Sequence, residues 1–238
     1  MIRAVLFDFY NTLGRFDPPR EKIQADACAE FGIEVTYEGI TRGYALADSF
    51  MAQESARQPL WTRSDSARAA FFGEYQRLLL DGAGVEVSHE LALQVFTRVR
   101  DTPRGYALYD DVLPALRSLK SRGTILGLLT NNRGDVNALC LDMGLFPLLD
   151  FAVSSEDVGA GKPDPAIFLE ALRRAGTEPR ETIHVGDQYD TDVKGAREVG
   201  IHPVLLDRDN MKIGDTDCPR ILGMGELPSL VEAVGQEA

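Results

Sequence analysis

The hydrophobic pattern in the second half of the chain alternates between two periods. Short, continuous apolar runs that end in polar residues alternate with segments whose apolar residues recur at helical spacing, an order typical of βαβ units and a parallel sheet. Together with the apolar run near the start of the chain, these runs predict strands at 4–7, 124–129, 150–154, 182–185 and 202–206. The helical pattern predicts helices at about 111–122, 134–143, 165–175, 188–199 and 226–235.

The first half shows a different pattern after its opening strand. Apolar residues recur at helical spacing in four segments, at roughly 20–31, 37–56, 64–81 and 88–100. Ser64 and Ser88 stand where helix N-caps belong, and we find no convincing strand in this region. The sequence therefore predicts a helical domain over 16–102, inserted into an α/β domain formed by 1–15 and 103–238.

Aromatic residues of the helical region are expected mainly in its core. These core candidates are Phe50, Phe71, Phe72, Tyr75 and Phe96. Trp61 differs from them because it lies in a short link between two predicted helices, and linking segments can face a neighbouring cleft. Trp61 is therefore a candidate for contact with a ligand.

Composition and charge narrow the classes of function. The chain has 238 residues, of which 44% are hydrophobic and 26% charged, which is ordinary for a soluble globular protein. Its formal net charge of -12 disfavours binding to nucleic acid or to an anionic membrane, because both require a basic surface. An anionic ligand would therefore need local positive charge, supplied by a metal ion or by a lysine.

No segment indicates export or a membrane anchor. No apolar run approaches the roughly 20 residues that a membrane span requires, and we find no secretory signal. The three cysteines, Cys28, Cys140 and Cys218, are far apart and form no CxxC pair. This usage predicts neither a disulfide framework nor a zinc site, and a reducing cytoplasm is the expected location.

Three predicted strands of the α/β domain end in polar residues. Asp8, Thr130 and Asp187 each follow a buried-looking apolar run. Ligands of open α/β sheets bind beyond the carboxyl ends of the strands, and right-handed crossovers make these strands neighbours. A carboxylate placed there can attack a substrate or hold a metal, although Asp8 alone could equally be a turn residue that caps the segment after it.

Four stretches, in this order, resemble the successive motifs of the haloacid dehalogenase-like hydrolase superfamily. They are FDFYNTL at 7–13, LLTN at 128–131, GKPDPAIF at 161–168 and HVGDQYDTDVKGA at 184–196. One branch of this superfamily inserts a helical cap between its first and second motifs, so the resemblance covers the whole chain. It implies a Rossmann-like core, with helices on both faces of a parallel sheet, and an inserted α-helical cap domain.

The resemblance also implies residue roles. Asp8 would be the nucleophile that becomes a covalent aspartyl intermediate, a role that carboxylates can fill. Thr130 would hydrogen-bond the transferring group, and Lys162 would neutralise both the nucleophile and the substrate, where the plain alternative is a solvated loop lysine. Further substrate contacts would come from Asn11, Thr12 and Asn131.

The fourth motif is unusually acidic. Asp187, Asp190 and Asp192, placed close to Asp8, would repel one another unless a cation lay among them. Oxygen ligands on a loop at a strand end suit Mg²⁺. By the resemblance, the metal ligands would be Asp8, the backbone carbonyl of Tyr10 and Asp187, with Asp192 as a partner just behind them.

Two motifs favour different reactions. Phosphatases of the superfamily usually carry an aspartate at the position of Tyr10, where it acts as general acid and base, whereas its dehalogenases carry tyrosine. Those dehalogenases need no metal, have a neutral residue in place of Asp187 and typically have serine in place of Thr130. They also bind the substrate carboxylate with a cap arginine. Candidates for it here are Arg42, Arg57 and Arg63.

We give the metal site more weight, because an acidic cluster without a cation would be an electrostatic cost. The leading hypothesis is a Mg²⁺-dependent phosphatase that acts on a small phosphorylated metabolite through an aspartyl-phosphate intermediate, with a preference for activated leaving groups. The alternatives are a metal-independent 2-haloacid dehalogenase and a phosphate-binding or interaction protein with weak turnover. The expected partner is a small anionic molecule, with the chain a monomer or homodimer.

Overall fold

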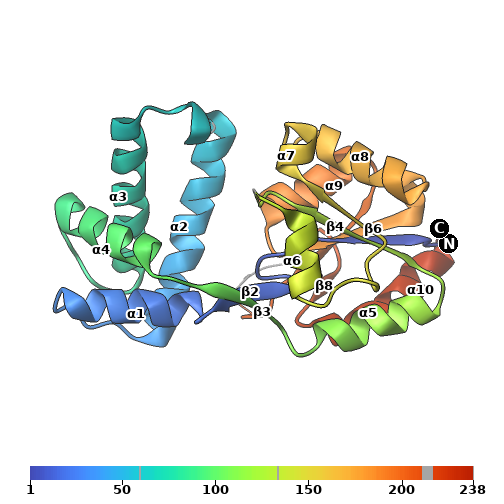
Figure 1. Cartoon of the computed structure of the whole chain (residues 1–238), viewed down its shortest axis with the longest axis horizontal. Coiled ribbons are helices and arrows are strands. Elements are labelled where there is room, and N and C mark those ends of the chain that lie inside the picture. The colour runs from blue at the N-terminus through green and yellow to red at the C-terminus, as the bar shows by residue number, and fades with distance from the viewer. Residues whose placement is uncertain (59, 133, 211–216, 238) are drawn as a thin grey trace. The chain divides into compact units, whose positions relative to one another are not determined.

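The computed structural model describes residues 1–58, 60–132, 134–210 and 217–237 (Figure 1). Its contacts divide the chain into two units. The core unit comprises Met1–Arg15 and Tyr106–Ala238, and the helical unit comprises Phe16–Gly105. The sequence predicted that the helical domain ends at residue 102. In the structure the helical unit ends at Gly105, the first residue of the strand β3 (Gly105–Leu108).

The core unit contains a six-stranded sheet in the order β5-β4-β1-β6-β7-β8, in which all neighbouring strands are parallel. Its strands are β1 (Ala4–Phe7), β4 (Ile125–Thr130), β5 (Phe151–Ser154), β6 (Thr182–Gly186), β7 (His202–Leu206) and β8 (Arg220–Ile221). The sheet confirms the predicted Rossmann-like α/β class. Because β1 lies between β4 and β6, the polar residues that follow these three strands emerge at neighbouring positions of one edge.

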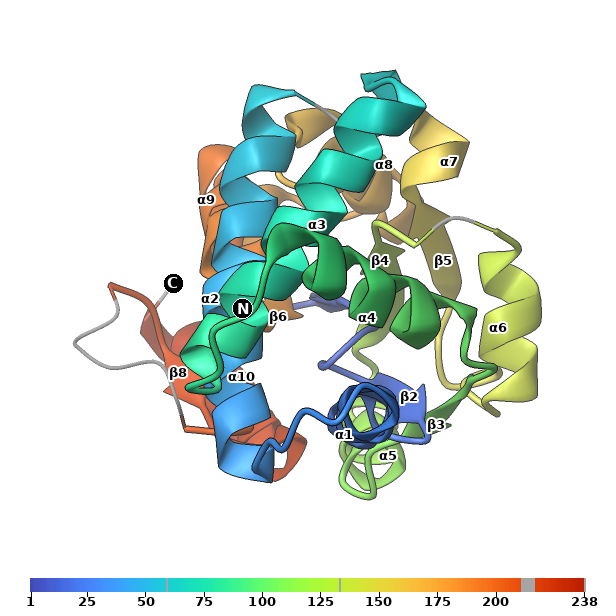
Figure 2. The same ribbon diagram turned by 90° about the vertical axis from the view of Figure 1, so that its left-hand side faces the viewer.

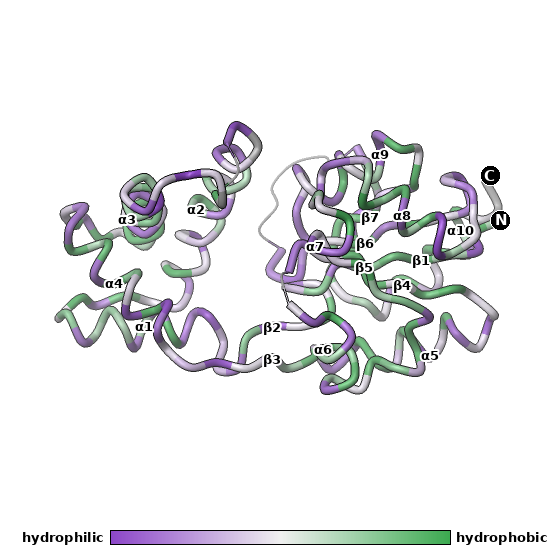
Figure 3. The backbone as a smooth tube through the Cα atoms, turned by 45° about the horizontal axis from the view of Figure 1, so that its top comes forward, coloured by the Kyte–Doolittle hydropathy of each residue, from purple (hydrophilic) through white to green (hydrophobic). Residues whose placement is uncertain are grey.

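Helices cover both faces of this sheet. Val5 and Phe7 of β1 belong to a hydrophobic cluster with α5 (Val112–Ser121), α6 (Val136–Asp142) and α10 (Leu227–Glu237). Leu6, which points the other way, packs with residues of α8 (Pro165–Ala175) and α9 (Lys194–Glu198). Figure 1 shows α5 and α10 on one side of the strands and α8 and α9 on the other. In Figure 3 the strands of this sheet are largely hydrophobic, as burial on both faces requires.

Several short elements of the core unit were not predicted. They are the helical turns α7 (Ser155–Val158), η2 (Pro179–Glu181) and η4 (Met224–Glu226), together with β8. The helix predicted at about 188–199 is broken, since a π-helical turn, η3 (Tyr189–Val193), precedes α9. Turns of three to five residues are too short for a periodic pattern to reveal them.

The helical unit contains α1 (Arg20–Glu30), α2 (Tyr37–Arg57), a 3₁₀ turn η1 (Leu60–Thr62), α3 (Asp65–Gly82) and α4 (His89–Asp101), as Figure 2 shows. The hydroxyls of Ser64 and Ser88 accept hydrogen bonds from backbone N–H groups of α3 and α4, which confirms both predicted N-caps. Helices α2 and α3 approach backbone to backbone. A Cβ atom on Gly43 would lie 2.0 Å from the carbonyl oxygen of Leu79, so this contact requires glycine.

The predicted aromatic core of the helical unit is present. Phe71 and Tyr75 are buried, Phe50 stacks on Phe71, and Phe72 stacks on Phe96 with ring centroids 4.4 Å apart. The backbone of Trp61 lies in η1, but its side chain is outside the described part of the structure. Its predicted contact with a ligand therefore stays a prediction.

A two-stranded ribbon stands where the chain passes between the units. It pairs β2 (Gly14–Asp17) with β3 (Gly105–Leu108), neither of which the hydrophobic pattern predicted. Both strands have only four residues, and the side chains of β3 are exposed or half-buried, so neither presents an apolar run or a clear alternation.

The three cysteines differ in burial. Cys28 and Cys140 are buried and Cys218 is half-buried, and no disulfide joins any of the three. None of the helices in the described ranges is long and apolar enough to cross a membrane.

Arg208, in the loop after β7, joins three segments of the core unit. Its guanidinium donates to both carboxylate oxygens of Asp111 at 3.0 Å and to the carbonyl oxygen of Thr12 at 2.9 Å. The same group lies 3.9 Å from the ring centroid of Tyr109. Asp111 also accepts the backbone N–H of Met224 at 2.8 Å. The loop after β1 is thus tied to the start of α5 and to η4.

Replacing Asp111 with asparagine should lower the free energy of unfolding by about 1 to 3 kcal/mol at neutral pH, because a half-buried guanidinium loses its charged acceptor. Burial opposes ionisation of Asp111, but the hydrogen bonds from Arg208 outweigh it and hold the pKa below its ordinary value. A carboxyl with a lowered folded-state pKa stabilises the fold above its unfolded pKa of about 4, and this contribution is lost as pH falls through the folded value.

Urea unfolding of the native protein and of Asp111→Asn, at about pH 7 and about pH 3.5, measures this contribution. The difference between the two proteins should shrink at the lower pH. Asp110→Asn is the matched control, because Asp110 is the exposed neighbour and its change should cost less than about 0.5 kcal/mol. An equal difference at both pH values would contradict the assigned role of the Asp111 charge.

Candidate active site

Asp8 stands at the carboxyl end of the central strand. Its backbone N–H donates to the carbonyl oxygen of Val185 at 2.9 Å, which continues the pairing of β1 with β6 by one residue. The chain then turns sharply, since the N–H groups of Leu13 and Gly14 both donate to the carbonyl oxygen of Phe9 at 2.8 Å. Asn11 adopts a left-handed backbone conformation with φ 57° inside this turn. The turn keeps the whole first motif beside the end of β1.

Lys162 links two of the predicted acids. Its Nζ donates to Oδ1 of Asp8 at 2.6 Å and to Oδ1 of Asp192 at 2.6 Å. The lysine side chain is 3% exposed, so these ion pairs lie out of bulk water. The alternative of a solvated loop lysine does not describe this residue. A buried cation shared by two carboxylates holds the third and fourth motifs against the first.

The electrostatics of this group follow from burial and from the shared lysine. Burial disfavours a charged ammonium, yet Asp192 and Asp8 outweigh it and raise the pKa of Lys162. Burial also disfavours an ionised Asp192, but Lys162 and His184 reverse this effect and hold the pKa of Asp192 below its ordinary value. For Asp8, burial prevails over Lys162 and raises its pKa. Asp192 is thus the better-stabilised anion of the two.

Asn131 fixes the backbone at Lys162. Its Oδ1 accepts the backbone N–H of Lys162 at 2.6 Å, and its Nδ2 donates to the carbonyl oxygen of Lys162 at 2.9 Å. The hydroxyl of Ser155 donates to the carbonyl oxygen of Asn131 at 3.2 Å. The contact of Asn131 with a substrate stays a prediction, and in the structure both polar atoms of its amide hold the backbone of Lys162.

Two threonines of the predicted site are buried. Thr130 ends β4, is 3% exposed and accepts the backbone N–H of Asn132 with its hydroxyl at 3.1 Å. Thr12 is fully buried, and within the described residues no protein group bonds its hydroxyl. The Thr12 side chain is therefore closed to a substrate in this structure, whereas its carbonyl serves Arg208.

The acids of the first and fourth motifs come together. Asp8, Asp187 and Asp192 each offer a carboxylate oxygen within 4.8 Å of the others. Asn11, predicted as a substrate contact, donates its amide to Asp187 at 3.4 Å. Asp190 does not join this cluster, since it pairs with Lys194 one helical turn away.

The carboxylate of Asp192 is held by several donors. Its Oδ2 accepts the backbone N–H of Gln188 at 3.0 Å, and its Oδ1 accepts Nε2 of His184 at 3.0 Å in addition to Lys162. A Cβ atom on Gly186 would lie 2.2 Å from Cγ of Asp192, so the carboxylate can lie against the backbone only because that residue is glycine. His184 was not predicted as part of the site. The signal in the sequence that could have identified His184 is a polar residue between the apolar residues of a predicted strand.

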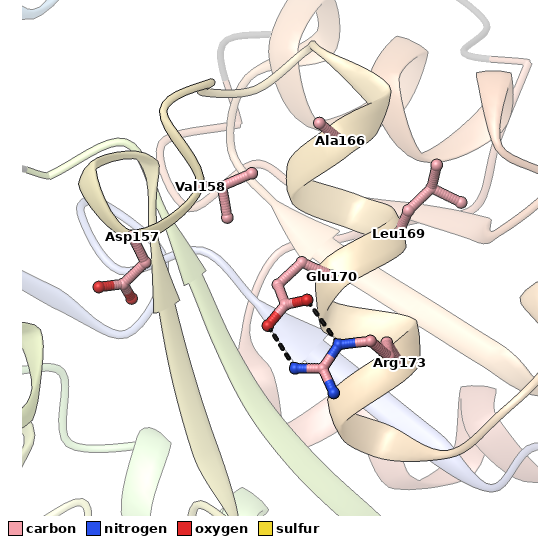
Figure 4. Close-up of a pocket in the computed structure, with 6 residues that line it drawn as sticks. All are labelled: Asp157, Val158, Ala166, Leu169, Glu170 and Arg173. Atoms are coloured by element: carbon pink, nitrogen blue, oxygen red, sulfur yellow. Dashed lines mark hydrogen bonds and ion pairs between the residues drawn. The ribbon is translucent and has the colours of Figure 1, made fainter.

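A surface hollow elsewhere on the core unit has a different character. It lies between α7 and α8, and Figure 4 shows Glu170 paired with Arg173 along one side. Its lining residues are Asp157, Val158, Ala166, Leu169, Glu170 and Arg173. No lysine, histidine or cluster of acids lines it, so the reactive groups are those at the strand ends.

The chain belongs to the haloacid dehalogenase-like hydrolases, since the family model of that description matches residues 2–200. It is 36% identical to a phosphoserine phosphatase of Thermus thermophilus over 95% of this chain and 96% of that protein. It is 28% identical to a glyceraldehyde 3-phosphate phosphatase of Methanopyrus kandleri over 87% of this chain and 85% of that protein.

Among solved structures, a 2-haloacid dehalogenase from Pseudomonas syringae is 28% identical, with a TM-score of 0.57 over 100% of both chains. Proteins with different named activities are therefore similar to this chain. The family and the hydrolase class are common to them, and the choice of substrate depends on particular residues of the site.

Proposed function

We propose that this hydrolase is a Mg²⁺-dependent phosphatase that acts on a small phosphorylated metabolite through an aspartyl-phosphate intermediate. The observation that carries the proposal is the cluster of Asp8, Asp187 and Asp192, in which Asp8 and Asp192 share the buried ammonium of Lys162. Three carboxylates so close together repel one another, and a bound cation relieves that repulsion. The phosphatases among its relatives add support.

The donors of the cluster fit Mg²⁺, which prefers oxygen ligands and commonly takes one or two carboxylates. Asp8 and Asp187 would hold it, together with the backbone carbonyl of Tyr10. Asp192 would act behind them, since both its oxygens already accept hydrogen bonds from Lys162, His184 and Gln188. Bound there, the ion would supply positive charge to a phosphoryl group.

The chain's own residues account for the remaining chemistry. A carboxylate oxygen of Asp8 forms a bond to phosphorus while the ester P–O bond breaks and the leaving oxygen takes the bonding pair. Water then attacks phosphorus, which releases inorganic phosphate and restores the carboxylate. Lys162 keeps Asp8 oriented and offsets the charge of the phosphoryl oxygens, and Thr130 hydrogen-bonds the transferring group.

A 2-haloacid dehalogenase is the second candidate. Tyr10 favours it, and so does the likeness to the Pseudomonas syringae dehalogenase. In that reaction Asp8 would attack carbon, and the halide would leave with the bonding electrons without needing a proton. The acid at Asp187 favours the phosphatase, because a metal-free site gains nothing from a third carboxylate beside Asp8.

One comparison separates the candidates. The protein is incubated with Mg²⁺ and an aryl phosphate or acetyl phosphate, and separately with 2-chloropropionate, and released phosphate and chloride are measured. Phosphate release that depends on Asp8 supports the phosphatase. Chloride release without phosphate release supports the dehalogenase. Phosphate binding with neither product would favour a binding protein with weak turnover.

Removal of the metal should abolish phosphate release. EDTA should stop turnover and added Mg²⁺ should restore it, and Asp187→Asn should lower the rate sharply because it removes a charged ligand. Asp192→Asn should cost less, about 10 to 100-fold, since it acts through its neighbours. Asp190→Asn is the matched control, because Asp190 lies in the same motif but outside the cluster. Full phosphatase activity in chelator would contradict the metal assignment.

A further inference from the structure

His184 is a fully buried polar residue in the middle of an apolar strand. It lies in β6, where it pairs in register with Leu6 of β1 and Pro203 of β7. Its ring meets Phe168 of α8 edge to face, with centroids 5.3 Å apart. The residue is 0% exposed, so substrate and solvent do not reach it in this structure.

The polar contact of the His184 ring is with the carboxylate of Asp192. Nε2 lies 3.0 Å from Oδ1 of Asp192, and a carboxylate only accepts hydrogen bonds, so the proton is on Nε2. Among the described residues no group bonds Nδ1. Burying the unpaired Nδ1 of this imidazole in a packed strand costs free energy, which an aliphatic side chain would not. Packing alone does not account for His184.

The oxygen that His184 contacts also receives Lys162. Oδ1 of Asp192 accepts both Nε2 of His184 and Nζ of Lys162, while Oδ2 accepts the backbone N–H of Gln188. With one donor on Oδ2 and two on Oδ1, the plane of the carboxylate is fixed. Without His184 the carboxylate could rotate, and Lys162 could follow it away from Asp8.

We propose that His184 is a positioning residue, whose Nε2–H holds the Asp192 carboxylate so that Lys162 is directed at Asp8. This role deepens the proposed phosphatase function and rests on it for its kinetic consequence. Hydrogen bonds lead from His184 to Asp192, from Lys162 to Asp192 and from Lys162 to Asp8, so Lys162 connects His184 with the nucleophile. The predicted effect therefore falls on turnover and spares substrate binding.

Three variants of His184 separate positioning from packing. In glutamine, Nε2 stands the same number of bonds from Cβ as Nε2 of histidine, so His184→Gln can still donate to Asp192. In asparagine the amide nitrogen stands one bond closer to Cβ, at the position of Nδ1. His184→Asn therefore buries a similar polar group that cannot donate to Asp192. His184→Leu removes the donor and the buried polar atoms together.

The expected kinetics follow from these geometries. His184→Asn and His184→Leu should lose about 10 to 100-fold in kcat with little change in KM, and His184→Gln should retain most of the activity. His184→Leu should remain folded at the assay temperature, which a thermal unfolding curve checks. His202→Leu is the matched control, because His202 lies on β7, next to β6, and its Nε2 bonds the backbone carbonyl of Arg180. This variant should leave kcat unchanged.

A second measurement needs no turnover. In ¹⁵N-detected NMR of the histidine side chains, His184 should carry a slowly exchanging proton on Nε2, assigned by its absence from His184→Gln and its presence in His202→Leu. Asp192→Asn should alter this signal. If the native protein releases no phosphate, the proposed function fails while the NMR result still decides the inference.

Several results would overturn the inference. They are a native kcat in His184→Leu, an equal loss in the glutamine and asparagine variants, or a proton on Nδ1 in place of Nε2. A loss of activity that follows the unfolded fraction in each variant would also reduce His184 to a packing residue.

Discussion

Asp8→Asn should lower phosphate release by about 10³-fold or more and leave the fold intact. An amide does not attack phosphorus as a carboxylate does, so the covalent step is lost. The fold should survive because Asp8 lies at the end of β1, beyond the packed part of the sheet, and because asparagine keeps an oxygen that can accept Lys162. Burial already disfavours the charge at this position, so the neutral amide relieves that cost.

Rates of phosphate release and circular dichroism of the native and variant proteins measure the two parts of this prediction. Asp110→Asn is the control, since it removes an exposed acid of the core unit that lies outside the four motifs. Turnover that persists in Asp8→Asn would exclude Asp8 as the nucleophile and would require another carboxylate to take that role.

The native protein should hydrolyse aryl and acyl phosphates about 10² to 10⁴ times faster than alkyl phosphates of similar size, which is the range that a general acid contributes. Tyr10 occupies the position where phosphatases of the family carry an acid that protonates the leaving oxygen. A phenol is a far weaker acid than a carboxylic acid, so an alkoxide would leave poorly here. Phenolates and carboxylates depart without a proton.

Values of kcat/KM for an aryl and an alkyl phosphate measure this preference. Tyr10→Asp should narrow it by raising the rate on the alkyl ester, whereas Tyr10→Phe keeps the ring and should leave the preference in place. Equal rates on the two esters in the native protein would mean that another group supplies the proton. A fall on the alkyl ester alone in Tyr10→Phe would identify the phenol as that group.

Much of the core unit could be predicted because its strands are buried on both faces and its helices on one. The runs at 4–7 and 125–129 contain no polar side chain, and the polar residues that come next, Asp8 and Thr130, mark the strand ends. The order of the motifs then placed Asp8, Lys162, Asp187 and Asp192 in one group, as the structure has them.

Other features depend on contacts between residues far apart in the sequence, and no local pattern reports those. The pairing of Arg208 with Asp111 and the amide of Asn131 around Lys162 are of this kind. The contact between His184 and Asp192 spans only one strand end, yet it depends on the irregular turn η3, which departs from the helical period that the sequence pattern assumes.

The hydrogen bonds between Asn131 and the backbone of Lys162 also suggest where the chain can be lengthened. Two hydrogen bonds join Asn131, just after β4, to the backbone of Lys162. They close the segment between these two residues, which includes α6, into a loop. The position of the Lys162 backbone is fixed where this loop closes, at Asn131. An insertion at the exposed turn of Gly144 would lengthen the loop without moving the contact between Asn131 and Lys162. This turn is therefore a suitable place to attach a reporter peptide.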